Sequence, residues 1–208
     1  MFIPALRHVR TEDGARLPML AWRFPEPMTV ASTAAVGGGV GSRRWVINAQ
    51  VGNGYLRRDQ AKHAKELARV AGLDGTGVVM FTAADVRRVR LGVDGGVQAE
   101  ATVGLTHPTW AADVDGVHNG EPGTINIVVF VPVRLAPGAL LNALTTATEA
   151  KVQAMHEAGV PGTGTASDAI AVACPAAGDV VPYAGPRSMW GARLARAVHA
   201  AVLAGDRA

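Results

Sequence analysis

Cysteines, aromatic residues and long apolar runs are scarce in this sequence. Its 208 residues contain a single cysteine, Cys174, so an internal disulfide is excluded and a cysteine-based zinc site is not expected. A chain without disulfides suits a reducing compartment. The first 14 residues lack the continuous apolar segment of a signal peptide, and the longest apolar run, residues 127–133, is far too short to span a bilayer. We therefore expect a cytoplasmic protein with no membrane partner.

The charge balance gives little reason to expect a nucleic-acid partner. The net charge is only +3, and the arginines are scattered without interleaved aromatic residues. Hydrophobic residues make up 49% of the chain and charged residues 18%, which excludes a disordered protein. Because aromatics reach only 5% while glycines number 25, the core must be built from Ala, Val and Leu with close backbone packing.

The pattern of elements predicts a mixed α/β (α+β) fold: a single layered domain in which a mixed sheet with one hairpin packs against three main helices. The length suits one domain. We expect residues 1–27, closed by Pro25-Glu26-Pro27, to be an N-terminal extension packed on a domain of residues 28–208. The expected strands are 19–24, 28–35, 44–51, 77–91, 97–105, 123–133 and 166–174, and the expected helices are 56–71, 137–158 and 188–203. Strands 77–91 and 97–105 form the hairpin, and the alternation of apolar residues with Gln98, Glu100 and Thr102 predicts a sheet covered on one side.

A glycine-rich segment, residues 37–42, does not fit a phosphate-binding loop. Such a loop ends in Lys-Ser/Thr and opens a helix, whereas this segment lacks the lysine and is followed by a strand. We expect a tight turn that lets the backbone approach a ligand or a neighbour.

The stretch 123–174 carries polar residues of catalytic type in apolar surroundings. Asn126 lies inside a strand, Lys151 on the apolar side of a helix and Asp168 within a run of Ala and Ile. Burial of such groups costs about 1–3 kcal/mol each unless they are hydrogen-bonded. We therefore predict that this strand–helix–loop–strand unit forms the floor of an active site.

Several segments together resemble one known family, the adenosylcobinamide amidohydrolases (CbiZ). The matching segments cover roughly residues 28–200 in order: VINAQV with the preceding GGG, FTAADV, ATVGLTHP, GTINIVVFV, ATEAKVQAM, GTGTASDAIAVACP and GPRSMWGARLARAV. Asn is more usual in the family where His107 stands, and Thr where Ser167 stands. The resemblance implies hydrolysis of adenosylcobinamide to adenosylcobyric acid and aminopropanol, in a salvage route to coenzyme B12. The corrinoid, with its cobalt, is then the substrate, and no further cofactor or protein-bound metal is expected.

Amide hydrolysis needs an activated nucleophile, donors for the developing oxyanion and an acid for the leaving amine. We predict Asp168 as general base for water or for a hydroxyl, and Asn126 with nearby backbone N–H groups as oxyanion donors. Lys151 would polarise the carbonyl or lower the pKa of a neighbouring group. Completing the predicted catalytic set are Thr165, Ser167 and Glu149, although Glu149 stands only two positions from Lys151 and so points elsewhere. The predicted substrate-binding residues are Asn48, Asn53, Thr82, Thr106, His107, Thr124 and Thr163.

Other interpretations stay open at this stage. Thr163 and Thr165 can simply shape a turn, Asp168 can cap backbone amides, and Lys151 can reach the surface. A metal-dependent variant would need His107, His118 and His156 with Asp113 or Asp115, and the loop 110–122 is a candidate lid. Two rival classes are a self-cleaving N-terminal-nucleophile hydrolase of the ornithine acetyltransferase kind and a non-catalytic corrinoid-binding protein. Whether the chain forms a homo-oligomer is also open.

Overall fold

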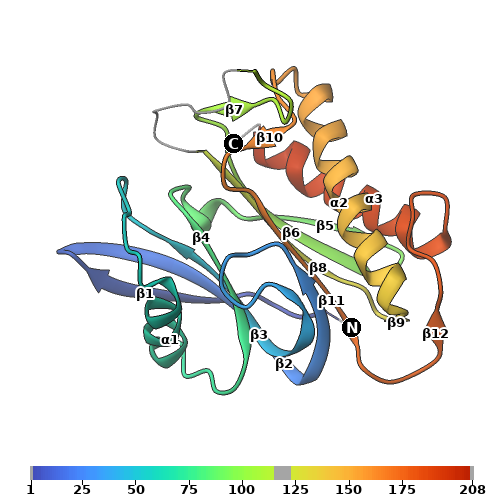
Figure 1. Ribbon diagram of the computed structural model, residues 1–208, viewed down its shortest axis with the longest axis horizontal. Coiled ribbons are helices and arrows are strands. Elements are labelled where there is room, and N and C mark those ends of the chain that lie inside the picture. Colours follow the sequence, from blue (N-terminus) through green and yellow to red (C-terminus); the bar gives the residue numbers. More distant parts are fainter. Residues whose placement is uncertain (1, 115–122, 207–208) are drawn as a thin grey trace.

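A computed structural model describes residues 2–114 and 123–206, and it confirms the predicted mixed α/β class. One large sheet has the order β4-β3-β2-β11-β8-β6-β5, with β1 paired to β2 (Figure 1). Its strands are β1 (Leu6–Glu12), β2 (Ala15–Ser32), β3 (Gly39–Gln50), β4 (Gly77–Thr82), β5 (Arg90–Asp94), β6 (Val97–Gly104), β8 (Thr124–Phe130) and β11 (Ala169–Pro175). Two small pairs join β7 (Pro108–Thr109) to β10 (Gly164–Thr165) and β9 (Arg134–Leu135) to β12 (Val180–Val181).

The N-terminal half of the sheet is built on a long hairpin. β1 and β2 are joined by a turn at Asp13-Gly14, where both residues have positive φ. β2 then runs through Pro25-Glu26-Pro27, so the prediction that these prolines end a strand is wrong. The pairing of β2 with β3 shifts register between Arg23 and Met28, and such an irregularity accommodates prolines that lack an N–H to donate. The division of the chain at residue 27 stays a prediction, and β2 spans that position.

Only part of the predicted hairpin 77–105 has the predicted form. β5 and β6 pair around Gly95-Gly96, which confirms the turn. The single strand expected over residues 77–91 is instead two strands, β4 and β5, at opposite edges of the sheet order. The one-turn 3-10 helix η1 (Val86–Arg88) lies between them.

The sheet curls strongly, so its inner face is also a core. Side chains of strands that are distant in the sheet order meet across this face: Asn126 on β8 donates to Asn48 on β3 at 2.9 Å, and Trp22 on β2 donates to Glu100 on β6 at 2.8 Å. The prediction of a sheet covered on one side is therefore wrong. The polar residues of β6 are buried: Gln98 is 2% exposed, Glu100 7% and Thr102 1%.

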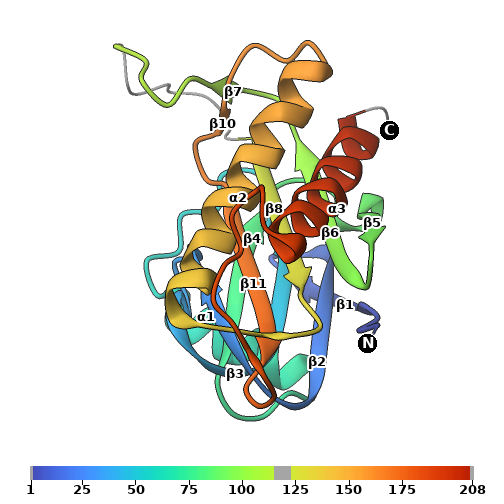
Figure 2. The same cartoon turned by 90° about the vertical axis from the view of Figure 1, so that its right-hand side faces the viewer.

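The helices cover the outer face. α2 (Pro137–Glu157) and α3 (Met189–Asp206) pack against each other and over β5, β6 and β11, whereas α1 (Gln60–Val70) covers β2 and β3 (Figures 1 and 2). α2 begins at a proline and ends before Gly159, as predicted. α1 begins four residues later than predicted, and Leu56 stays in the preceding loop with 89% of its surface exposed. The described residues contain no helix with the length and apolar character needed to cross a membrane.

The glycine-rich segment forms the expected tight turn against a neighbouring strand. Gly37 has φ +74°, and a Cβ added there would lie 2.0 Å from the carbonyl oxygen of Gly77 on β4. Only glycine fits this approach. The close contact is with backbone, so this turn serves packing.

Candidate active site

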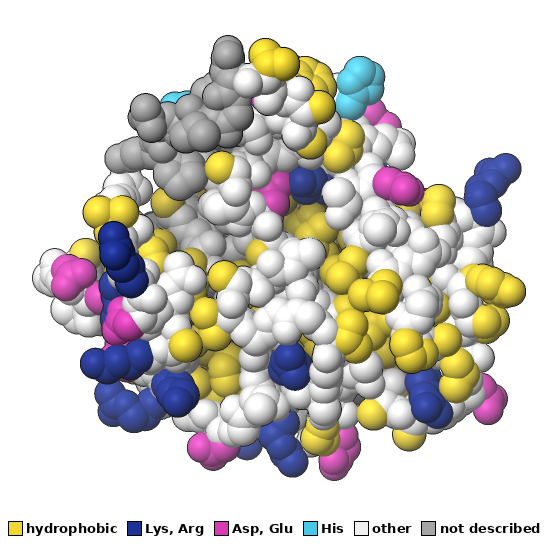
Figure 3. Space-filling view, viewed as in Figure 1, with side chains coloured by type: hydrophobic (Ala, Val, Ile, Leu, Met, Phe, Trp, Pro, Cys, Tyr) yellow, Lys and Arg dark blue, Asp and Glu magenta, His cyan; other side chains and the backbone are white. Residues whose placement is uncertain are grey.

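An uncharged cavity lies where several strand ends meet. The parallel strands β3 and β4 end there, and the parallel strands β8 and β11 begin there. The cavity has a volume of about 500 Å³ and is lined by Val51, Gly52, Asn53, Gly54, Tyr55, Leu56, Gln60, Phe81, Thr82, Ala83, Thr124 and Ser167. None of these residues is charged; a group of basic side chains lies at the lower left of this face, over α1, and others are scattered over the rest of it (Figure 3). The lining suits an uncharged group that offers and accepts hydrogen bonds.

Asp168, next to the cavity residue Ser167, holds together a cluster of polar groups through four hydrogen bonds. Its Oδ2 contacts Lys151 Nζ at 2.5 Å and accepts from the Thr165 backbone N–H at 3.1 Å. Its Oδ1 accepts from the backbone N–H of Ile125 at 2.8 Å and contacts Thr165 Oγ1 at 2.5 Å. All four lone-pair positions of the carboxylate are thus occupied. A water molecule or a substrate group can donate to Asp168 only if one of these donors leaves, whereas the Thr165 hydroxyl is already in contact with it.

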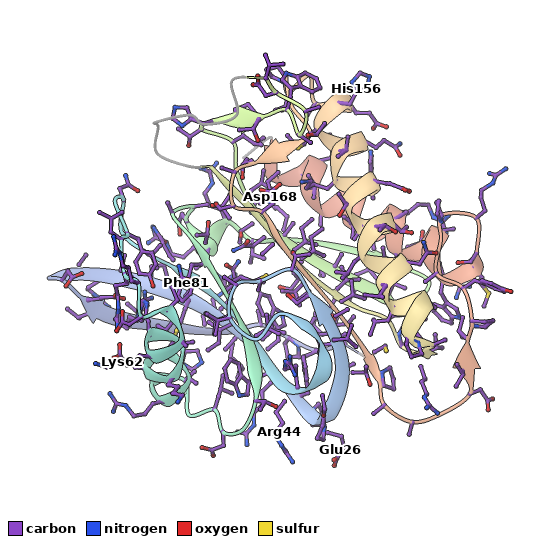
Figure 4. All side chains as sticks on the ribbon, in the orientation of Figure 1. Glu26, Arg44, Lys62, Phe81, His156 and Asp168 are labelled. Atoms are coloured by element: carbon purple, nitrogen blue, oxygen red, sulfur yellow. The ribbon has the colours of Figure 1, made fainter. Side chains whose placement is uncertain are left out.

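The buried ion pair explains two residues that look out of place in the sequence. The side chain of Lys151 is 7% exposed and that of Asp168 13%, so each compensates the charge of the other. Figure 4 shows Asp168 at the upper end of the strands, beside α2. The pair joins α2 to the loop before β11, which places Ser167 at the cavity wall.

The number of protons available determines which hydroxyl group at the cavity wall donates and which accepts. Thr165 Oγ1 lies 2.5 Å from Asp168 Oδ1 and 2.7 Å from the Gly123 carbonyl oxygen, but its single proton serves one of them. The charged acceptor Asp168 is the stronger one. Ser167 then donates to Gly123 O at 3.2 Å, and Thr124 donates to Ser167 Oγ at 2.7 Å. This assignment leaves a lone pair of Ser167 for a ligand in the cavity.

The two asparagines form a separate buried cluster. Asn126 Nδ2 donates to Asn48 Oδ1 at 2.9 Å and to the Phe81 carbonyl at 3.2 Å, and Asn48 donates to Thr102 at 2.9 Å. Both protons of the Asn126 amide are therefore in use, and its Oδ1 has no hydrogen-bond donor among the described residues. Neither asparagine lines the cavity, although Phe81, which accepts from Asn126, does.

The predicted residues therefore fall into several places. The structure brings Asn53, Thr82, Thr124 and Ser167 to the cavity and places Asp168, Lys151 and Thr165 behind it. Glu149 is exposed on the outer side of α2, away from Lys151, and Thr106 and His107 are exposed after β6. Thr163 accepts from the Ala111 N–H at 2.9 Å and so belongs to the β7–β10 pair.

The metal and lid hypotheses depend partly on residues outside the described ranges. His118, Asp115 and residues 115–122 of the proposed lid lie there. Among the residues that the structure does describe, no three His, Cys, Asp or Glu side chains come together in a group fit to hold a metal ion. Within these ranges His156 lies at the far end of α2 (Figure 4), exposed to solvent.

Sequence reasoning missed the aromatic wall of the cavity. Tyr55 and Phe81 line it, and Phe81 lies above α1 in Figure 4. The Tyr55 hydroxyl contacts His63 Nδ1 at 2.8 Å, and His63 is only 1% exposed. Its position four residues before Leu67, on the apolar stripe of α1, was the available signal.

A concave, mostly apolar cavity with a few converging polar groups is the usual form of a small-molecule binding site. Comparison with known proteins gives the family. The family model described as "Adenosylcobinamide amidohydrolase" (CbiZ) matches residues 4–208, so the chain belongs to this family.

Two similar proteins carry the same description as the family model, and a third is uncharacterised. An adenosylcobinamide amidohydrolase of Methanosarcina mazei is 28% identical over 184 residues, which cover 84% of this chain and 88% of that protein. One from Halobacterium salinarum is 35% identical over 133 residues, which cover 61% of this chain and 57% of that protein. An uncharacterised protein of Methanocaldococcus jannaschii is 35% identical over 100 residues, 43% of this chain and 39% of its own length.

Proposed function

We propose that this protein hydrolyses the amide that joins the corrinoid to aminopropanol in adenosylcobinamide, at the cavity bounded by Thr124 and Ser167. Membership of the amidohydrolase family along nearly the whole chain supports the reaction. The observation that carries the location is the cavity itself, whose wall is uncharged and presents hydroxyl groups. An amide and an alcohol are uncharged groups of that kind, and binding them needs few charged partners.

The size of the cavity limits which part of the substrate enters. About 500 Å³ is the volume of a pocket that encloses a drug-sized molecule, whereas a corrinoid is considerably larger. We therefore place the aminopropanol arm and the adjoining edge of the macrocycle inside, with the rest of the ring at the mouth. Leu56, 89% exposed beside the cavity, offers an apolar surface to that ring.

The residues of the wall then orient the amide. Ser167 and Thr124 touch the scissile group, because their hydroxyls are the polar atoms on the side of the cavity nearest to the ion pair. Asp168 acts by position: it fixes Lys151, the Thr165 hydroxyl and two backbone N–H groups, and so holds Ser167 in place. As a general base for water, Asp168 would need one of these contacts to open, whereas as a base for a hydroxyl it already contacts Thr165.

The test is incubation of the purified chain with adenosylcobinamide and detection of products by mass spectrometry. We expect aminopropanol and adenosylcobyric acid in equal amounts. Corrinoid binding without aminopropanol would instead indicate a binding protein. The mass of the chain, measured in the same experiment, should be that of one intact polypeptide, since self-processing would split it.

A further inference from the structure

A series of hydrogen bonds runs from the partly buried Glu12, at the end of β1, to the cavity wall. Glu12 Oε2 on β1 lies 3.2 Å from His63 Nε2 on α1, and His63 Nδ1 lies 2.8 Å from the Tyr55 hydroxyl. Tyr55 lines the cavity. None of these three residues belongs to the Asp168 cluster, and the mechanism above leaves them without a role.

The direction of each hydrogen bond in this series follows from Glu12, the residue at which the series begins. The Glu12 carboxylate forms an ion pair with Arg10 at 2.7 Å, and a carboxylate only accepts. His63 Nε2 therefore carries the proton that it donates to Glu12. In a neutral imidazole the other nitrogen, Nδ1, is then an acceptor, so Tyr55 donates its only proton to it. The phenolic oxygen retains only lone pairs for any group in the cavity.

Aromatic packing keeps this arrangement in place. Phe81 stacks on Tyr55, with ring centroids 5.3 Å apart, and on His63, also at 5.3 Å. The imidazole is 1% exposed, so water does not compete for its nitrogens. Tyr55 is thus a fixed part of the wall, with a defined hydrogen-bonding character.

We propose that Tyr55 is a specificity-determining residue of the cavity, whose oxygen accepts a hydrogen bond from an N–H or O–H group of the substrate. The inference rests on the proposed function for the identity of that substrate. A cobinamide offers two sources of such a donor: the primary amides at the rim of the macrocycle and the hydroxyl of the aminopropanol arm.

Protonation of His63 reverses the hydrogen-bonding character of Tyr55. An imidazolium donates at both nitrogens, so its Nδ1–H would take the phenolic lone pair and the phenol proton would turn toward the cavity. An N–H or O–H group of the substrate would then face the Tyr55 O–H, which is itself a donor, and no hydrogen bond could form. The acceptor form of Tyr55 therefore depends on a neutral His63.

Some of the groups around His63 raise its pKa and others lower it. Burial lowers the pKa of His63 below its ordinary value, Glu12 opposes this effect, and Arg57 and Arg10 reinforce it. Glu66, on the same helix, is paired with Arg57 at 2.9 Å. The neutral imidazole consequently prevails at pH 7 and above, and affinity should fall as the pH drops through the lowered pKa.

The experiment compares Tyr55→Phe with a matched control, Tyr183→Phe, whose ring is 72% exposed and lies outside the cavity wall. For each variant we would measure the KM for adenosylcobinamide and the Kd for adenosylcobyric acid, which lacks the aminopropanol hydroxyl. Loss of one neutral hydrogen bond predicts a three- to tenfold weaker affinity, about 0.65–1.4 kcal/mol, in Tyr55→Phe alone, with kcat within twofold. A change in both constants assigns the donor to a rim amide, and a change in KM alone assigns it to the hydroxyl.

The pH dependence separates recognition from a purely structural role. Wild-type affinity should decline on the acid side, whereas Tyr55→Phe and His63→Gln should bind with little dependence on pH between 5 and 8. Unchanged KM and Kd in Tyr55→Phe, or the same acid decline in both variants as in the wild type, would overturn the inference. Failure of the wild-type chain to release aminopropanol would refute the proposed function instead, and the Kd for adenosylcobyric acid would still test Tyr55.

Discussion

Gly164 occupies a place where even a methyl group would separate the buried ion pair. A Cβ added to this residue of β10 would lie 2.5 Å from Asp168 Oδ2 and 2.5 Å from Lys151 Nζ. Its φ is outside the left-handed region, so an alanine is compatible with the backbone and acts through crowding alone.

The cost of Gly164→Ala follows from this geometry. Ordinary van der Waals contact begins at 3.4 Å, so each charged atom must retreat by about 1 Å, and the pair opens on both sides of the new methyl group. Overpacking of this kind destabilises a protein by about 1–3 kcal/mol. We also expect kcat for adenosylcobinamide to fall at least tenfold, because Asp168 holds the loop that carries Ser167.

The assay is chemical denaturation together with the aminopropanol-release rate. Gly138→Ala is the matched control: Gly138 is exposed near the start of α2, and a Cβ there would meet nothing within 4 Å. The control should equal the wild type or gain slightly in stability. If Gly164→Ala kept both the wild-type free energy of unfolding and the wild-type rate, the ion pair would not organise this site.

Three further outcomes follow from the structure. Asn126→Ala should destabilise the protein by about 1–3 kcal/mol in urea unfolding, because it leaves the buried Asn48 oxygen without its donor; an unchanged unfolding midpoint would refute this. Glu149→Gln should leave kcat and KM within twofold, since Glu149 is exposed away from Lys151, and a tenfold loss of kcat would contradict the placement. Burial raises the pKa of Glu100, so its contribution to stability is full below pH 4.5 and is lost as the pH rises through the raised value. Glu100→Gln should remove this decline from stability measured between pH 4 and 8, and an unaltered pH profile would exclude Glu100 as its source.

Much of the fold follows from patterns that act locally. The apolar run of β8, the proline at the start of α2 and the glycine after its end each reflect the chemistry of neighbouring residues, and these elements were predicted within a few positions. The polar side of β6 was misread for a physical reason. Alternation shows that two faces differ, but it does not show that the polar face meets water, and here the curl of the sheet buries Gln98, Glu100 and Thr102.

Part of the candidate site can likewise be predicted from local sequence, and part depends on tertiary packing. Asp168 and Lys151 stand out in the sequence because each is charged in apolar surroundings, and the structure pairs them. Their proximity depends on packing between α2 and the loop before β11, which no spacing along the chain encodes. Tyr55 and His63 are only eight positions apart, but the contact of His63 with Glu12 arises only when β1 and α1 meet.

Cleavage of the amide at the cavity wall is the central claim, and one comparison tests it most directly. Aminopropanol release from adenosylcobinamide should be measured for the wild type, for Ser167→Ala with Thr124→Val, and for Thr148→Ala, an exposed hydroxyl on α2 outside the cavity wall. We expect release by the wild type and the Thr148 variant. For the double variant we expect a loss of at least about 100-fold in kcat/KM, about 2.7 kcal/mol of transition-state stabilisation. A double variant as active as the wild type would contradict the assignment of this cavity.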